Sequence, residues 1–147
     1  MSPRHRTLAP LFVCLAALLT VASGCIVVVD DDGFGRNRSL HGTSWHLSFI
    51  FAHGHHYRVQ QSDPYGITFS SSEELTGSAG CASFTADYDL SDSSIRINRF
   101  RSSTLGCTQD EVQSLFLEYL PAVTEVNMSD ESLELLAGDG AQLVFER

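Results

Sequence analysis

The clearest pattern in the chain is a strict alternation of apolar and polar residues from Ala82 to Ser91. Every second residue of this run is apolar, and the residues between them are serine, threonine or aspartate. A period of two residues places all the apolar side chains on one face of a β-strand. A strand with one apolar and one polar face is typical of an antiparallel sheet, so the run predicts a long strand that is buried on one side only.

Shorter runs of the same kind precede and follow this strand, separated by turn sequences such as Asp92-Ser93 and Gly138-Asp139-Gly140. In the first run, Trp45, Leu47 and Phe49 alternate with polar residues, which predicts that these three side chains share a buried face. The predicted strands lie within residues 40–51, 67–70, 75–78, 82–91, 95–98, 123–128, 132–136 and 141–145. About eight short strands joined by tight turns predict a mainly β (α+β) fold in which a small antiparallel meander curls into a barrel.

One segment has helical periodicity instead and predicts an α-helix over residues 108–120. Thr108 and Glu111 have the spacing of a capping box, in which each side chain bonds the other residue's backbone N–H. Apolar residues then recur about every 3.6 positions, so one face of the helix is expected to be buried, and Pro121 ends the helix. The apolar residues of this face are Val112, Leu115, Phe116, Tyr119 and Leu120.

Residues 1–24 have the pattern of a secretory signal peptide. Arg4 and Arg6 precede an apolar core at residues 11–19, and small residues at 22–24 lead to Cys25. This end resembles the lipobox of bacterial lipoproteins. The resemblance implies that the Cys25 thiol carries a diacylglycerol, that the leader is cut before Cys25, and that the new amino terminus is acylated. Several acyl chains together would anchor the protein firmly in the lipid bilayer.

Two other outcomes are compatible with this leader. Cleavage near Gly24 would release a soluble protein, and an uncut segment from Leu8 to Val29 would remain as an anchor helix. All three outcomes export the domain. Ile26, rather than aspartate, follows Cys25, and by resemblance to lipoproteins of double-membraned bacteria this implies an outer-membrane location facing the periplasm. Residues 25–39 are acidic and glycine-rich, which predicts a flexible tether between the lipid and a domain at residues 40–147.

Export also decides how the cysteines are interpreted. The chain has 4 cysteines, of which Cys14 lies in the leader and Cys25 is the expected lipid site. An oxidising compartment favours disulfides, so the remaining Cys81 and Cys107 are expected to pair. The bridge would close a loop of about 27 residues and contribute roughly 3 kcal/mol in the chain-entropy model. Its geometry requires the two Cα atoms to lie within about 7 Å of each other.

The charge and the motifs argue against several functions. A formal net charge of −9 is unsuited to nucleic acid or to docking on anionic lipid. The chain has no Gly-x-Ser-x-Gly, Cys-x-x-Cys or His-Glu-x-x-His sequence, so we expect no enzymatic activity and no cofactor. Asp87 and Asp89 share a strand face that is expected to be solvated. His53, His55 and His56 form a histidine-rich turn in which two rings would suit a metal, but a solvated loop is the expectation.

The domain resembles the META domain family, also called HslJ-like. The resemblance rests on four marks in order: Gly42-Thr43-Ser44-Trp45-His46-Leu47; Gly77, Gly80-Cys81, Phe84 and Tyr88; Thr104-Leu105-Gly106-Cys107; and the hairpin of Leu133, Leu135, Leu143 and Phe145. The chain departs from the family in having Ala82 where asparagine is usual and Ala86 where glycine is frequent. The family implies a small lipocalin-like barrel with one helix, export as a lipoprotein, and links to stress responses, and it supplies no catalytic residue.

These observations predict a non-enzymatic envelope lipoprotein that acts as a structural, stress-associated or assembly module and contacts a protein partner. The alternative is a barrel that binds a small apolar ligand in its interior. An interior cavity of a few hundred Å³ would favour the ligand, and a filled interior would favour the partner protein. The aromatic residues available to line such a cavity are Trp45, Tyr65, Phe84, Tyr88 and Phe100.

Overall fold

The computed structural model describes residues 39–104, 106 and 108–147, and these residues form a mainly β domain. The predicted signal peptide, the lipid site at Cys25 and nearly all of the tether lie outside the described residues. The strands are β1 (Ser44–Ala52), β2 (His55–Arg58), β3 (Tyr65–Phe69), β4 (Glu74–Ala79), β5 (Ala82–Ser91), β6 (Ser94–Thr104), β7 (Val123–Met128), β8 (Ser132–Ala137) and β9 (Gln142–Glu146). One helix, α1 (Glu111–Tyr119), continues into the 3₁₀ turn η1 (Leu120–Ala122).

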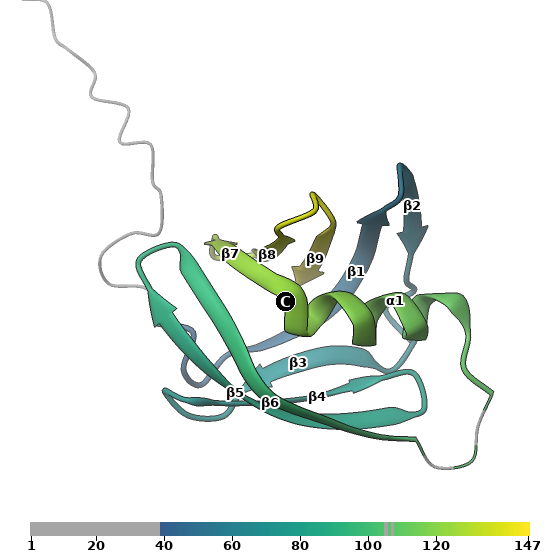
Figure 1. The fold of residues 1–147 in the computed structure, drawn as a ribbon, viewed down its shortest axis with the longest axis horizontal. Helices are drawn as coiled ribbons and strands as arrows, with labels where there is room; N and C mark the ends of the chain where they lie inside the picture. Colours follow the sequence, from purple (N-terminus) through teal and green to yellow (C-terminus); the bar gives the residue numbers. More distant parts are fainter. Residues whose placement is uncertain (1–38, 105, 107) are drawn as a thin grey trace, which may run out of the picture. The chain divides into compact units, whose positions relative to one another are not determined.

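The strands form one antiparallel sheet that closes on itself, which confirms the predicted meander barrel (Figure 1). Neighbouring strands pair in chain order from β3 to β9, and β9 then pairs with β1. The first half of β1 pairs with β3, and its second half pairs with β2. The β1–β2 hairpin therefore projects beyond the closed barrel, and β2 is not one of the barrel strands. The barrel therefore has eight strands, and β2 is an additional short strand that the sequence pattern did not predict.

The barrel is weakest between β6 and β7. Ser94 and Glu125 are the one residue pair that joins these strands, and the Val126 amide donates to the Ser93 carbonyl at 2.8 Å. The chain between β6 and β7 contains α1, which lies across the barrel in Figure 1. The 3₁₀ turn η1, which follows the helix, packs against β6 and β8, and its Leu120 is fully buried. Within the described part of the chain, no helix combines the length and the hydropathy needed to cross a membrane.

The start of α1 differs from the prediction. Asp110, not Thr108, is the N-cap residue, and its side chain accepts a hydrogen bond from the Gln113 amide at 2.7 Å. The predicted capping box of Thr108 and Glu111 is therefore wrong, because the helix begins at Glu111. Aspartate is as good an N-cap as threonine, so the local sequence offered two starts. The hydrogen bond that the Tyr65 hydroxyl of β3 donates to the Asp110 carboxylate favours the later start.

A bulge in β1 changes which of its side chains face the core. The pairing of β1 with β9 shifts register between Leu47 and Phe49. A β-bulge inserts one residue and thereby reverses the inside–outside alternation beyond it. Leu47 and Ile50 consequently both face the interior and are fully buried. The prediction that Phe49 shares this face is wrong: Phe49 is half-buried and its ring lies 5.6 Å from that of His56.

A second bulge lies in β6. Thr85 pairs with Arg101, but Asp87 pairs with Asn98, so β6 contains one more residue than β5 over this stretch. At the bulge the backbone of Arg99 has a φ of 48°, a value that non-glycine residues rarely adopt. Beyond the bulge, the Phe100 ring stacks on Phe84 at 5.3 Å between centroids. Without the bulge, the alternation would turn arginine side chains into the barrel and Phe100 out of it.

The interior of the barrel is filled by side chains. Phe116 of α1 is fully buried, and its ring lies 6.1 Å from Tyr65, 5.8 Å from Phe84 and 6.1 Å from Phe145. These rings come from β3, β5 and β9, so Phe116 joins three parts of the barrel wall to the helix. The arrangement of tilted and edge-on rings is the one that aromatic quadrupoles favour.

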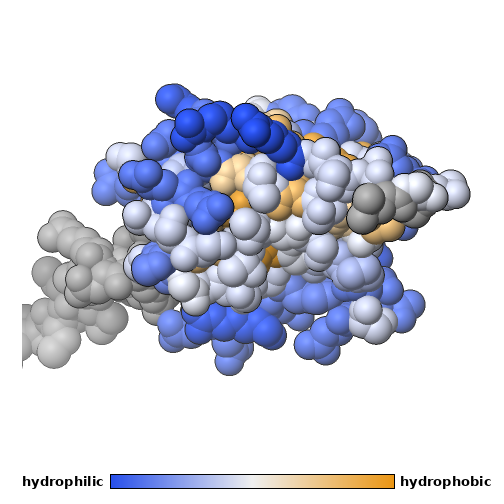
Figure 2. Space-filling model, turned by 90° about the horizontal axis from the view of Figure 1, so that it is seen from below, coloured by the Kyte–Doolittle hydropathy of each residue, from blue (hydrophilic) through white to orange (hydrophobic). Residues whose placement is uncertain are grey.

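The outer face of β3, β4 and β5 is rich in hydroxyl groups. The side chains of Ser44 and Thr68 hydrogen-bond at 3.0 Å, and those of Ser83 and Ser103 hydrogen-bond at 3.1 Å. Figure 2, which looks at the molecule from below, shows many pale residues of intermediate hydropathy, small orange areas between them and blue residues toward the periphery. This side of the barrel is the solvated face that the alternation in β5 predicts.

Candidate functional site

The candidate site is a groove of about 400 Å³ beside the first turn of α1, here called the α1 groove. Its walls come from the end of β2 and the connection to β3, from the β4–β5 turn, and from the start of α1. These segments are far apart in the sequence, and closure of the barrel brings them together. The residues that line the groove include Arg58, Val59, Asp63, Tyr65, Gly80, Asp110, Val112 and Gln113.

Asp110 holds the two sides of the groove together. Its carboxylate accepts the Gln113 amide at 2.7 Å and the Tyr65 hydroxyl at 3.0 and 3.1 Å. Tyr65 starts β3 and is buried, so this hydroxyl ties the sheet to the N-cap of the helix. Burial, followed by the hydrogen bond to Asp110 and the negative charges of Asp110 and Asp63, raises the pKa of Tyr65 well above its ordinary value.

Replacing Tyr65 with phenylalanine should alter both the stability and its dependence on pH. At pH 7, the loss of the hydrogen bond to Asp110 is expected to cost about 1–2 kcal/mol of unfolding free energy. Because the folded-state pKa is raised, the stabilisation by Tyr65 is complete below about pH 10 and is lost as the pH rises above it, where the unfolded chain ionises first. Tyr65→Phe should therefore lose less stability than the wild type between pH 9 and about 11. Urea titrations of both proteins across this pH range measure the effect. If the free energy of unfolding fell equally steeply with pH in the two proteins, the prediction would be wrong.

Gln113 is a buried polar residue in the wall of the groove. Only 1% of it is exposed, and its Nε2 has no hydrogen-bond partner among the described residues. Its Oε1 lies 3.5 Å from the Cys81 sulfur. Sequence reasoning missed Gln113 because it is polar and adjoins the predicted apolar face of the helix. Its spacing of three residues before Phe116 and seven before Leu120 was the available signal, since these positions share one helical face.

Gly80 allows the β4–β5 turn to approach the helix. Its φ is +60°, and a Cβ atom there would lie 3.0 Å from the Tyr65 hydroxyl and 3.3 Å from Gln113 Oε1. The Gly80-Cys81 pair seen in the sequence therefore lies in the wall of the groove. The predicted partner of Cys81, Cys107, lies outside the described residues, so the Cys81–Cys107 disulfide stays a prediction.

The histidines of the β1–β2 hairpin contact different neighbours. His53 occupies the turn with a φ of 53°, and its Nε2 lies 3.0 Å from the Tyr119 hydroxyl. The His56 ring packs 4.8 Å from that of Phe51 on the outer face. Among residues 39–104, 106 and 108–147, no three His, Cys, Asp or Glu side chains are grouped so that they could hold a metal ion. Gly54 forms the predicted hairpin tip, while His55 and His56 belong to β2.

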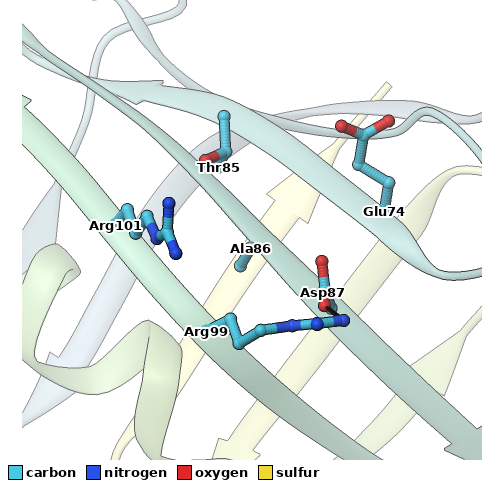
Figure 3. A pocket seen from close by; sticks show the side chains of 6 residues that line it. All are labelled: Glu74, Thr85, Ala86, Asp87, Arg99 and Arg101. Carbon is cyan, nitrogen blue, oxygen red and sulfur yellow. Dashed lines mark ion pairs between the residues drawn. The ribbon is translucent and has the colours of Figure 1, made fainter.

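A second hollow of about 320 Å³ lies on the outer face next to the β6 bulge (Figure 3). Arg99 forms an ion pair with Asp87 there, and Figure 3 shows its side chain reaching toward that carboxylate. Asp89 accepts a hydrogen bond from Asn98 Nδ2 at 2.8 Å. Asp87 and Asp89 thus lie on the outer face, as predicted, and each has a partner on β6. The hollow is lined by two acidic residues, Glu74 and Asp87, and two basic residues, Arg99 and Arg101, so its formal charges balance.

Comparison with known proteins agrees with this architecture. A protein from Burkholderia xenovorans, solved by NMR, matches with a TM-score of 0.59 and 26% identity over 74% of this chain and 83% of that chain. A DUF4847 family protein from Bacteroides vulgatus matches with a TM-score of 0.57 and 14% identity over 73% and 93% of the two chains, which shows the fold alone. No curated protein sequence matches. The model of the META domain matches residues 38–147, and the chain therefore belongs to the META domain family.

Proposed function

We propose that this META domain protein is a non-enzymatic module of the cell envelope that is anchored through an acylated Cys25 and binds a partner protein. The observation that supports this most is the filled barrel interior. Trp45, Phe84 and Tyr88 are each 3% exposed, and the Tyr88 ring packs edge-on against Phe69 at 5.0 Å. Aromatic residues that lined a ligand cavity would instead have an open side. Recognition is therefore assigned to the outer surface.

The polar groups near the α1 groove support a binding role over a catalytic one. Asp110 is engaged as a helix cap and as the acceptor of the Tyr65 hydroxyl. The raised pKa of Tyr65 keeps its phenol protonated, so it is unsuited to act as a base at neutral pH. These groups hold the groove in shape, which is what a binding surface requires.

The anchor is tested by expressing the full-length gene in a double-membraned bacterium. We expect the mature protein to fractionate with the outer membrane and to carry acyl groups on Cys25, and we expect Cys25→Ser to lose both properties. Membrane fractionation and intact mass spectrometry measure this. An unmodified Cys25 would contradict the lipid anchor: an intact leader would then indicate the anchor helix, and a cut leader a soluble protein. Peptides from the unreduced protein would also report whether Cys81 and Cys107 are linked.

The partner is tested by placing a photo-crosslinking amino acid at exposed positions in intact cells. The positions should cover both the α1 groove and the hydroxyl-rich face of β3–β5. We expect a discrete crosslinked species of constant mass from one of these two surfaces and none from the other. The absence of a discrete species at every position tested would contradict the proposal of a protein partner.

A further inference from the structure

We propose that the α1 groove binds an extended peptide segment of the partner protein, which adds as a strand to the free edge of β2. This inference rests on the proposed function, since it requires a protein partner. It is carried by three features that meet in the groove: an unpaired strand edge, a buried amide donor without a partner, and walls of mixed polarity.

The first feature is the edge of β2. Among the described strands, β2 pairs with β1 alone. The Val59 amide donates to the Ser48 carbonyl at 2.9 Å, and Arg58 is opposite Phe49 in the register. Backbone groups alternate between the two edges of an antiparallel strand, so the N–H and C=O of Arg58 point away from β1. Arg58 and Val59 are also lining residues of the groove, so the end of β2 adjoins it. Such an edge is a template for strand addition.

The second feature is Gln113, a residue of the groove wall whose buried Nε2 has no hydrogen-bond partner among the described residues. A buried donor without a partner is costly, and most buried polar groups in proteins are satisfied. Rotation of the Gln113 side chain toward the groove would bring this donor to a peptide carbonyl, which would supply the acceptor. The donor lies on α1 and the free edge on β2, so a segment between them can be held from both sides.

The third feature is the composition of the walls, which favours a peptide over other ligands. A phosphate or another small anion would meet two carboxylates, those of Asp63 and Asp110, against the single guanidinium of Arg58. An apolar ligand would leave the Gln113 donor unpaired. A peptide backbone presents carbonyls and amides in alternation, and its side chains can contact Val59 and Val112. The volume of about 400 Å³ is within the usual range for binding sites.

The test uses the purified mature protein in detergent and a displayed library of random twelve-residue peptides. Selected peptides are synthesised and their dissociation constants measured by fluorescence anisotropy. Gln113→Leu removes the unpaired donor and should weaken binding at least about tenfold, while leaving stability unchanged or raised. Arg58→Pro removes an outward-pointing N–H and should also weaken binding, while sparing the β1–β2 hydrogen bonds. Gln142→Leu on β9 is the matched control and should leave affinity unchanged.

The outcomes separate this inference from the proposed function. The α1 groove is supported as the peptide-binding site if both groove variants weaken peptide binding and a partner crosslinks from Val112. Peptides that bind equally well to Gln113→Leu and Arg58→Pro would overturn it. A discrete crosslinked partner obtained from the hydroxyl-rich face alone, with no selected peptides, would also overturn the groove while the partner-binding function stands. If no peptide is selected and no position crosslinks, both proposals fail.

Discussion

Replacing Phe116 with alanine is expected to lower the free energy of unfolding by about 3–5 kcal/mol, the range for removing a large aromatic side chain from a core. The Phe116 side chain is fully buried and contacts the rings of Tyr65, Phe84 and Phe145. Alanine would leave a cavity where the helix meets three strands of the barrel. These three rings come from β3, β5 and β9, so the cavity would loosen the packing of three separate strands against the helix.

Urea denaturation followed by tryptophan fluorescence measures this effect, since Trp45 is the single tryptophan of the chain. Leu117→Ala is the matched control, because Leu117 is adjacent on the same helix but only half-buried. It should cost about 1 kcal/mol, in line with a partly exposed position. A cost below about 1 kcal/mol for Phe116→Ala would show that α1 is not part of the cooperative core.

Gly77→Ala is expected to cost more than about 3 kcal/mol, beyond the usual range for overpacking, or to prevent folding. A Cβ atom at this position would lie 2.2 Å from the Gly66 carbonyl oxygen and 2.4 Å from Phe84 Cζ. Gly77 pairs with Phe84 across β4 and β5, and the ring covers the site where a side chain would be. The backbone oxygen cannot move without breaking the pairing of β3 with β4, so the strain has no inexpensive relief.

Gly138→Ala provides the control, because no atom lies within 4 Å of a Cβ built there. Its stability should stay within about 0.5 kcal/mol of the wild type. The double variant Gly77→Ala/Phe84→Leu should recover part of the loss, since the shorter side chain removes one of the two overlaps. Full recovery would show that the backbone overlap with Gly66 is unimportant, and wild-type stability of Gly77→Ala itself would refute the close approach of β3 and β4.

The strands and the family were accessible from the sequence because their signals are local. The alternation between Ala82 and Ser91 predicted β5 with its buried face, and Phe84 and Tyr88 are buried as expected. The periodicity of residues 112–120 predicted α1 and its buried Phe116. In each case the period of the pattern matches the repeat of the backbone, so the inference required no knowledge of the neighbours.

The α1 groove was not accessible in the same way. Its residues lie in three segments, represented by Arg58, Gly80 and Gln113. Gly80 belongs to a mark of the family, but none of the three segments carries a motif that indicates binding. The burial of Gln113 follows from the approach of the β4–β5 turn, which the positive φ of Gly80 permits. The free edge of β2 follows from the way β1 divides its pairing between β2 and β3.

The sequence by itself therefore determined the class of fold, the family, and the alternation that assigns most side chains to the inside or the outside of the barrel. Only the tertiary structure decided where that alternation reverses, at the bulges beside Phe49 and Arg99, because a bulge depends on which residue stands opposite in the partner strand. It likewise decided that the helix is capped by Asp110 rather than Thr108, because Tyr65, 45 residues away in the chain, donates its hydroxyl to that carboxylate. The groove results from the same long-range contacts.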